Sequence, residues 1–183
     1  GQEQLGSLFI DKVNQELYFL YSTNGSAAGT YVKKTSLTNF NPQTIFIIPE
    51  RIGNITDLEV SPATGVIHWS VYNSGNVGNG IFNYQNGINQ LFSASSVYAI
   101  CFNQAGDLYY VGSNGNNIYN LQGTVVHTTT INIDLLEYCD VTTQFFYAGN
   151  DYIYSSNNGL LFTSGGSSIQ AISLNDTTQE VIF

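Results

Sequence analysis

Two acidic residues, Asp57 and Glu59, lie two positions apart in an apolar stretch and have the spacing of a catalytic carboxylate pair. On a strand, residues two apart share a face, and paired carboxylates serve as acid and base in many hydrolases. The competing interpretation is the solvent-facing polar side of a strand. Because no Gly-x-Ser-x-Gly, His-Glu-x-x-His or phosphate-loop motif accompanies the pair, no residue is predicted to be catalytic.

The two histidines, His68 and His127, are each found beside apolar residues of a strand-like run. A lone histidine in a strand packs more often than it catalyses. Neither is near a cysteine pair with metal-ligand spacing, so a zinc site is excluded. The histidines therefore add no catalytic or metal-binding prediction.

Three Asn-x-Ser/Thr sequons begin at Asn24, Asn54 and Asn175. Each falls at an expected turn or strand end, where an acceptor for an N-linked glycan is accessible. All three are predicted glycosylation sites, and Asn24 is the strongest because its loop is long and rich in small residues. In a chain so rich in Asn, Ser and Thr, chance is the alternative explanation.

The elements that must position these residues are β-hairpins. Residues 97–110 read as an apolar strand, a polar turn containing Gly106, and a second apolar strand. The same hairpin recurs every 35 to 50 residues. The residues that end the first strand of each copy are Asp11, Ser61, Asn103, Asp140 and Asn175.

Between successive hairpins there is room for two more short strands, joined by Asn-Gly turns that supply the positive φ of tight connections. Four short antiparallel strands per repeat are typical of a β-propeller blade. The sequence thus predicts an all-β fold, a β-propeller-like array of four-stranded antiparallel blades with about four and a half repeats. The predicted repeats are 5–54, 55–96, 97–132, 133–166 and 167–183, in a single domain or propeller segment.

The segment 11–19 resembles the Asp-x-x-x-x-x-Leu-Tyr-Trp pattern of YWTD propellers, the class B repeats of lipoprotein receptors, and of the related NHL repeats. The later copies depart from the pattern: only Trp69 supplies a tryptophan, and no copy has the closing aspartate. The resemblance supports the fold and says little about function.

Propeller hydrolases and lactonases commonly hold a metal on the central axis with Glu, Asp and Asn. Under this alternative, a Ca²⁺ ion would be bound by the strand-end residues Asp11, Asn103, Asp140 and Asn175, whose oxygen ligands are suitable. Turn chemistry explains one such residue per repeat equally well. Under the leading interpretation no cofactor is expected.

Cys101 and Cys139 occupy the first strands of successive repeats, one position out of register. Two cysteines in a secreted chain favour a disulfide. Alternation along a strand would point the two side chains to opposite faces, which favours two buried free thiols instead. Both interpretations remain open at this point.

Composition sets limits on the partners. Charged residues make up only 9% of the 183 residues, which favours a secreted or extracellular protein with a neutral amide and hydroxyl surface. The four basic residues all precede position 52, and the formal net charge is −9. A chain without a basic footprint is not expected to bind nucleic acid or to insert into a membrane. No apolar stretch approaches the length of a transmembrane helix.

The leading interpretation is an extracellular, non-enzymatic propeller module for protein interaction or structural assembly, whose partner is another protein or further copies or segments of the same chain. The alternatives are a propeller hydrolase or lactonase with an axial metal, and a carbohydrate-binding lectin with sites between blades. Both termini offer the same first hairpin, so they are not expected to complete one blade together. We therefore expect the chain to be a segment of a longer protein, or a neighbouring chain to supply strands at 181–183.

Overall fold

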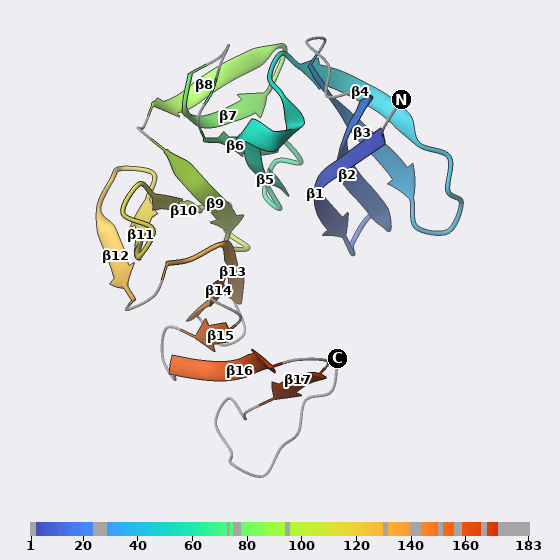
Figure 1. The fold of residues 1–183 in the computed structure, drawn as a ribbon. Helices are drawn as coiled ribbons and strands as arrows, with labels where there is room; N and C mark the ends of the chain where they lie inside the picture. The colour runs from blue at the N-terminus through green and yellow to red at the C-terminus, as the bar shows by residue number, and fades with distance from the viewer. Residues whose placement is uncertain are drawn as a thin grey trace.

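The computed structural model describes residues 3–23, 29–72, 74, 78–93, 96–129, 132–139, 144–149, 152–155, 159–165 and 168–171. They form four antiparallel sheets that follow one another along the chain (Figure 1). Blade 1 consists of β1 (Glu3–Asp11), β2 (Glu16–Thr23), β3 (Thr30–Ser36) and β4 (Gln43–Ile48). Blade 2, after the single 3₁₀ turn η1 (Ile52–Asn54), consists of β5 (Ile55–Val60), β6 (Ile67–Val71), β7 (Gly80–Tyr84) and β8 (Ile88–Ser93).

Blade 3 and blade 4 repeat this plan. Blade 3 consists of β9 (Val97–Phe102), β10 (Leu108–Gly112), β11 (Asn117–Asn120) and β12 (Val125–Thr128). Blade 4 consists of β13 (Leu135–Cys139), β14 (Gln144–Gly149), β15 (Tyr152–Ser155) and β16 (Gly159–Gly165), with β17 (Ser168–Ala171) added at its edge. Within the described residues, no helix is long and apolar enough to cross a membrane.

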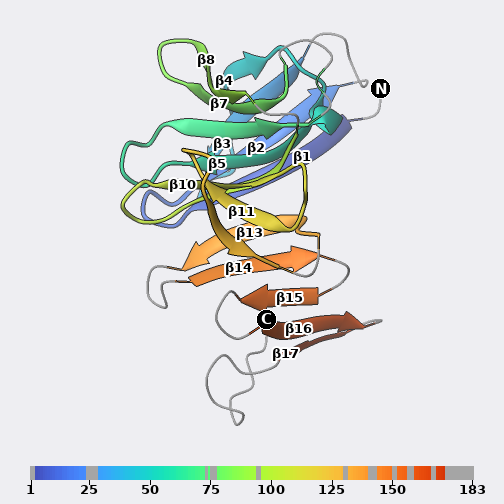
Figure 2. The same cartoon turned by 90° about the vertical axis from the view of Figure 1, so that its left-hand side faces the viewer.

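The first strand of each blade is the innermost. β1 contacts β5, β5 contacts β9, and β9 contacts β13, so the first strands line the centre while later strands lie further out (Figures 1 and 2). Each sheet is an up-and-down meander in which every strand pairs with the next. This arrangement confirms the predicted all-β fold of four-stranded propeller blades.

The core lies between the blades because strand side chains alternate between the two faces of each sheet. Leu20 of blade 1 and Leu58 and Trp69 of blade 2 are fully buried in one cluster between these blades. Trp69 stacks on Phe82 of its own blade and contacts Phe46 of blade 1. Two further clusters fill the spaces between blades 2 and 3 and between blades 3 and 4. Burial of these inter-blade clusters provides the main drive for stacking.

The predicted hairpin at 97–110 is confirmed, because β9 and β10 are antiparallel neighbours with Tyr110 opposite Ile100. At the other end of the chain the structure differs from the expected repeats. The segment 167–183 was expected to begin a fifth blade, whereas β17 pairs with β16 as a fifth strand of blade 4. This pairing satisfies backbone groups at the open edge of β16. Residues 172–183 lie outside the described residues, as does the predicted strand at 181–183.

Candidate functional sites

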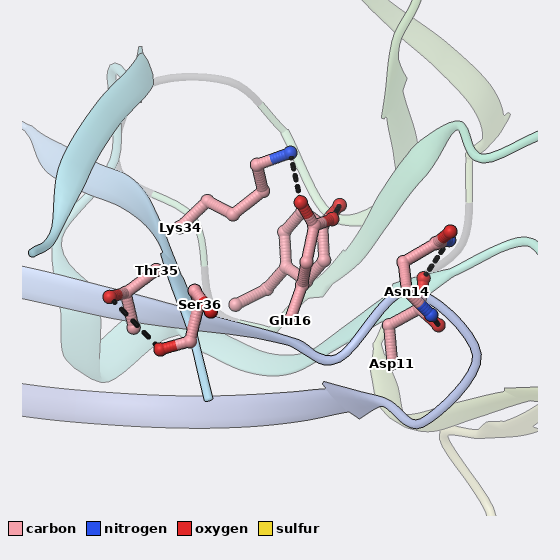
Figure 3. A network of polar contacts seen from close by, with 7 residues as sticks. Asp11, Asn14, Glu16, Lys34, Thr35 and Ser36 are labelled. Carbon is pink, nitrogen blue, oxygen red and sulfur yellow. Dashed lines mark hydrogen bonds and ion pairs between the residues drawn. The ribbon is translucent and has the colours of Figure 1, made fainter. Parts of the chain in front are cut away.

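The strand-end residue Asp11 stabilises a turn. Its Oδ1 accepts hydrogen bonds from the backbone N–H groups of Val13 and Asn14, and its Oδ2 accepts one from Asn14 Nδ2 at 2.7 Å. These bonds lower the pKa of Asp11, chiefly through Asn14. Beside the turn, the Lys34 ammonium pairs with Glu16 at 2.8 Å (Figure 3). Every side-chain oxygen of Asp11 is therefore used within its own hairpin.

Asn103 plays the same part in blade 3. Its Oδ1 accepts a hydrogen bond from Asp107 N, and its Nδ2 donates to Asp107 Oδ2 at 2.9 Å. Asp140 and Asn175 lie outside the described residues. No group of three or more His, Cys, Asp or Glu side chains in the described part of the chain is arranged to hold a metal ion. The described members of the predicted ligand set, Asp11 and Asn103, use their side-chain oxygens as acceptors in their own turns, and the axial metal stays a prediction.

Asp57 links the inner strands of three blades. Its Oδ1 accepts hydrogen bonds from Ser7 Oγ of β1 at 3.1 Å and from Leu58 N of β5, and its Oδ2 accepts one from Ile100 N of β9 at 3.0 Å. Burial raises the pKa of this carboxyl to about 6, against the opposing effect of the three donors. Asp57 is therefore a polar link at the centre of the array.

Glu59 shares the face of Asp57, as the spacing predicted, but the expectation of a solvent-facing side is wrong. Only 8% of Glu59 is exposed, and its carboxyl forms no hydrogen bond with the described residues. Burial, followed by the charges of Asp57 and of Glu137 on β13, raises its pKa to about 10. A β-bulge in β5 between Ile55 and Asp57 turns the pair toward blade 3, while Leu58 faces blade 1. Glu59 is consequently a protonated, neutral acid at neutral pH.

A row of polar residues crosses blade 2 from Glu59 outward. The strand register places Glu59 opposite His68, His68 opposite Asn83, and Asn83 opposite Asn89. The row faces blade 3, because the His68 ring contacts the ring of Phe102 edge-on at 4.9 Å. Sequence reasoning considered His68 a packed residue and did not single out Asn83. Only the cross-strand register reveals that they are neighbours.

A groove of about 570 Å³ opens between blades 2 and 3 at the end of this row. Its wall on blade 2 includes His68, Asn83 and Gln85, and its wall on blade 3 includes Phe102, Tyr109 and Asn120. Asp107 is the only Asp, Glu, Lys or Arg among its lining residues. The groove is thus a largely neutral, amide- and aromatic-lined site between two blades, of a size that holds small ligands.

Two other predicted site residues, Cys101 and Asn54, contact neighbours inside the fold. Cys101 is a free, buried cysteine in the cluster between blades 3 and 4, and burial raises the pKa of its thiol well above the usual value. The structure therefore has the buried-thiol arrangement for Cys101 and no bridge to Cys139, whose side chain is outside the described part. Asn54 Nδ2 donates a hydrogen bond to Oε1 of the fully buried Glu50. Asn24 and Asn175 lie outside the described residues.

The face of blade 1 that points away from blade 2 exposes large apolar side chains. It carries Leu8, Ile10, Ile45 and Ile47, of which Leu8 is 61% exposed, and Phe40 beside them stacks on Phe19. The opposite face carries Leu20, which blade 2 covers completely. We call this exposed surface the outer face of blade 1. It has the apolar character of a blade face that packs against another blade.

Stacked four-stranded sheets with their first strands innermost define a β-propeller, and the solved structures similar to this chain are β-propeller-like proteins. One is a candidate gluconolactonase (TM-score 0.62, 11% identity). The match covers 65% of that protein and 91% of this chain. Another is the virginiamycin B lyase of Staphylococcus aureus (TM-score 0.54, 15% identity), covering 59% of that protein and 95% of this chain. A third is an auxiliary nutrient-binding protein of Bacteroides thetaiotaomicron (TM-score 0.59, 8% identity), covering 44% and 97% respectively.

This chain therefore spans about half to two thirds of the length of these three structures. No protein-family model matches the sequence, and no curated protein matches it. At such low identities the similarity establishes the propeller fold and leaves function to be argued from this chain's own residues.

Proposed function

We propose that this chain is an extracellular, non-enzymatic propeller module that assembles with a further propeller blade through the outer face of blade 1. The observation that carries the proposal is the contrast between the two faces of blade 1. The face toward blade 2 is buried in a continuous core, whereas the outer face presents Leu8, Ile10 and Ile47 to solvent. Since a blade cannot bury both faces alone, an apolar face without a neighbour is an association surface.

The chemistry of this face suits a blade as its partner. Its apolar residues come from the inner strand β1 and from the outer strand β4, so they span the width of the sheet. Lys33, which lies on this face opposite Phe19, has its ammonium over the Tyr21 ring at 4.8 Å, and this cation–π contact partly offsets the cost of burying its charge. The low charge content and the sequons at Asn24 and Asn175 support the extracellular part of the proposal.

The test is the association state of the purified chain in analytical ultracentrifugation, since a second copy can offer a blade in place of the natural partner. We expect self-association at micromolar concentration that Ile47→Asp abolishes. The matched control is Leu135→Asp, which places the same charge at another exposed apolar position, on β13. A chain that stays monomeric, or one that associates equally well with Ile47→Asp, would show that the outer face of blade 1 is not an assembly surface.

Catalysis is the second candidate, and one observation favours it. Asp57 and Glu59 are neighbouring carboxyls whose surroundings separate their pKa values, to about 6 and about 10, as in acid–base pairs. The propeller neighbours include a lyase and a candidate gluconolactonase. An assay of lactone hydrolysis with and without added Ca²⁺ decides the matter: activity lost in Glu59→Gln would favour an enzyme. The three structural hydrogen bonds of Asp57 argue for the module instead.

A further inference from the structure

We propose that the groove between blades 2 and 3 binds a neutral saccharide. This goes beyond assembly through blade 1, because the groove lies on the far side of blade 2 from the outer face. The two proposals can therefore fail independently.

The first step is the hydrogen-bonding capacity of His68. Its Nδ1 lies 2.9 Å from the backbone oxygen of Val66, which can only accept, so Nδ1 carries the proton. Burial lowers the pKa of His68, which keeps the ring neutral, and Nε2 is then an unprotonated acceptor. Nε2 forms no hydrogen bond within the described part of the chain, although only 7% of the residue is exposed.

The second step is the complementary donor on Asn83. Its Oδ1 accepts a hydrogen bond from Asn89 Nδ2, and Asn89 is itself held by the backbone oxygens of Gln85 and Gly87. This contact fixes the amide of Asn83, whose Nδ2 donates to none of the described residues. Asn83 is 7% exposed and lines the groove beside His68, its register partner. Neither atom is fully enclosed, because both residues line the groove and their free polar atoms are open to it, so a ligand with matching hydrogen-bonding groups can replace the solvent on both.

The third step is the charge of the groove. None of the four basic residues of the chain lines it. Its one carboxylate, Asp107, already accepts a hydrogen bond from Asn103. An anionic ligand would meet no cation and one like charge, so the site disfavours anions.

A hydroxyl group matches the polar pair, because it donates to His68 Nε2 and accepts from Asn83 Nδ2 at the same time. The other walls suit the rest of a sugar ring. Phe102 and Tyr109 offer aromatic surface to its C–H groups, while the amides of Gln85 and Asn120 can bond its further hydroxyls. A volume of about 570 Å³ falls within the range of small-ligand pockets. Together these features define a neutral saccharide as the class of ligand.

The test uses saturation-transfer NMR with the methyl glycosides of glucose, galactose, mannose and N-acetylglucosamine, and with glucuronate as the anionic comparison. We expect at least one neutral glycoside to bind and glucuronate to give no signal. Two variants on the exposed strand β12 are matched: Val126 lines the groove, whereas its neighbour Val125 does not. Val126→Trp should weaken binding at least tenfold, while Val125→Trp should leave it unchanged.

The second part of the test removes the hydrogen-bond donor of Asn83. Asn83→Ala should weaken binding at least tenfold, with its fold checked by the fluorescence of buried Trp69. Equal binding to the Val126→Trp and Val125→Trp variants would overturn the proposal, as would the absence of binding by all four neutral glycosides. Binding of an uncharged peptide with no sugar binding would count against it as well.

Discussion

Replacing Glu59 by glutamine should flatten the pH dependence of stability. In the folded chain, burial and the nearby carboxylates raise the pKa of Glu59 from 4.5 to about 10. Because the native state holds this proton above pH 4.5 and the unfolded state releases it, the free energy of unfolding falls as the pH rises, until the folded pKa is passed. One such proton contributes at most about 1.4 kcal/mol per pH unit, or about 4 kcal/mol between pH 6 and pH 9.

The assay is urea unfolding at several pH values, followed by the fluorescence of Trp69, the single tryptophan, which is fully buried. Wild-type protein should lose stability from pH 6 to pH 9, while Glu59→Gln should lose most of that slope. Asp57→Asn is the matched control. The raised pKa of Asp57, about 6, confines its loss of stability to the interval between about pH 4 and pH 6, so this variant should keep the slope above pH 7. Equal slopes for wild type and Glu59→Gln would refute the reasoning.

Three other predictions concern the turns and the blade junction. A Cβ at Gly106, which has φ +89°, would meet Ala63 Cβ at 2.7 Å, whereas Gly123, with φ +80°, has open space around it. Gly123→Ala should therefore cost about 1 kcal/mol in urea unfolding, and Gly106→Ala about 1 to 3 kcal/mol more; equal costs would contradict the close approach. Glu50→Ala should cost roughly 2 to 3 kcal/mol, because it removes a buried carboxylate that accepts three part-buried hydrogen bonds; a loss under about 1 kcal/mol would show otherwise. Asn54 should carry no glycan when the chain is expressed in a eukaryotic secretory pathway, since its Nδ2 is bonded to Glu50, and a mass shift removed by Asn54→Gln would disprove this.

The fold was predictable because its signals are local. Alternating apolar residues, Gly-containing turns and the recurrence of one hairpin define each strand pair within about 15 residues. The strand-end residues were also readable as turn residues, and Asp11 and Asn103 do stabilise turns. What local signals could not place was β17, because its pairing with β16 competes with the start of another blade, and both choices satisfy the same alternating pattern.

The candidate sites depend on contacts between distant segments. Asp57 accepts a hydrogen bond from Ile100 N, 43 residues further on, so its role follows from the stacking of blades 2 and 3. Burial of Glu59 has the same origin, which explains why the expectation of a solvated strand side failed. The pairing of His68 with Asn83 depends on strand register, and a shift of one residue would have placed them on opposite faces.

A polar row inside an otherwise apolar stack of blades reduces stability, and this cost offers a last prediction. In His68→Leu, the backbone oxygen of Val66 keeps its hydrogen bond from Ser61 N, so no acceptor is orphaned when the imidazole is lost. The leucine would pack against Phe102 in the place of the buried ring. We expect stability to be unchanged or up to about 1 kcal/mol higher in urea unfolding, together with loss of saccharide binding. A destabilisation above about 2 kcal/mol would mean that the row is kept for the fold, whereas a stable protein that no longer binds sugar would mean that it is kept for the ligand.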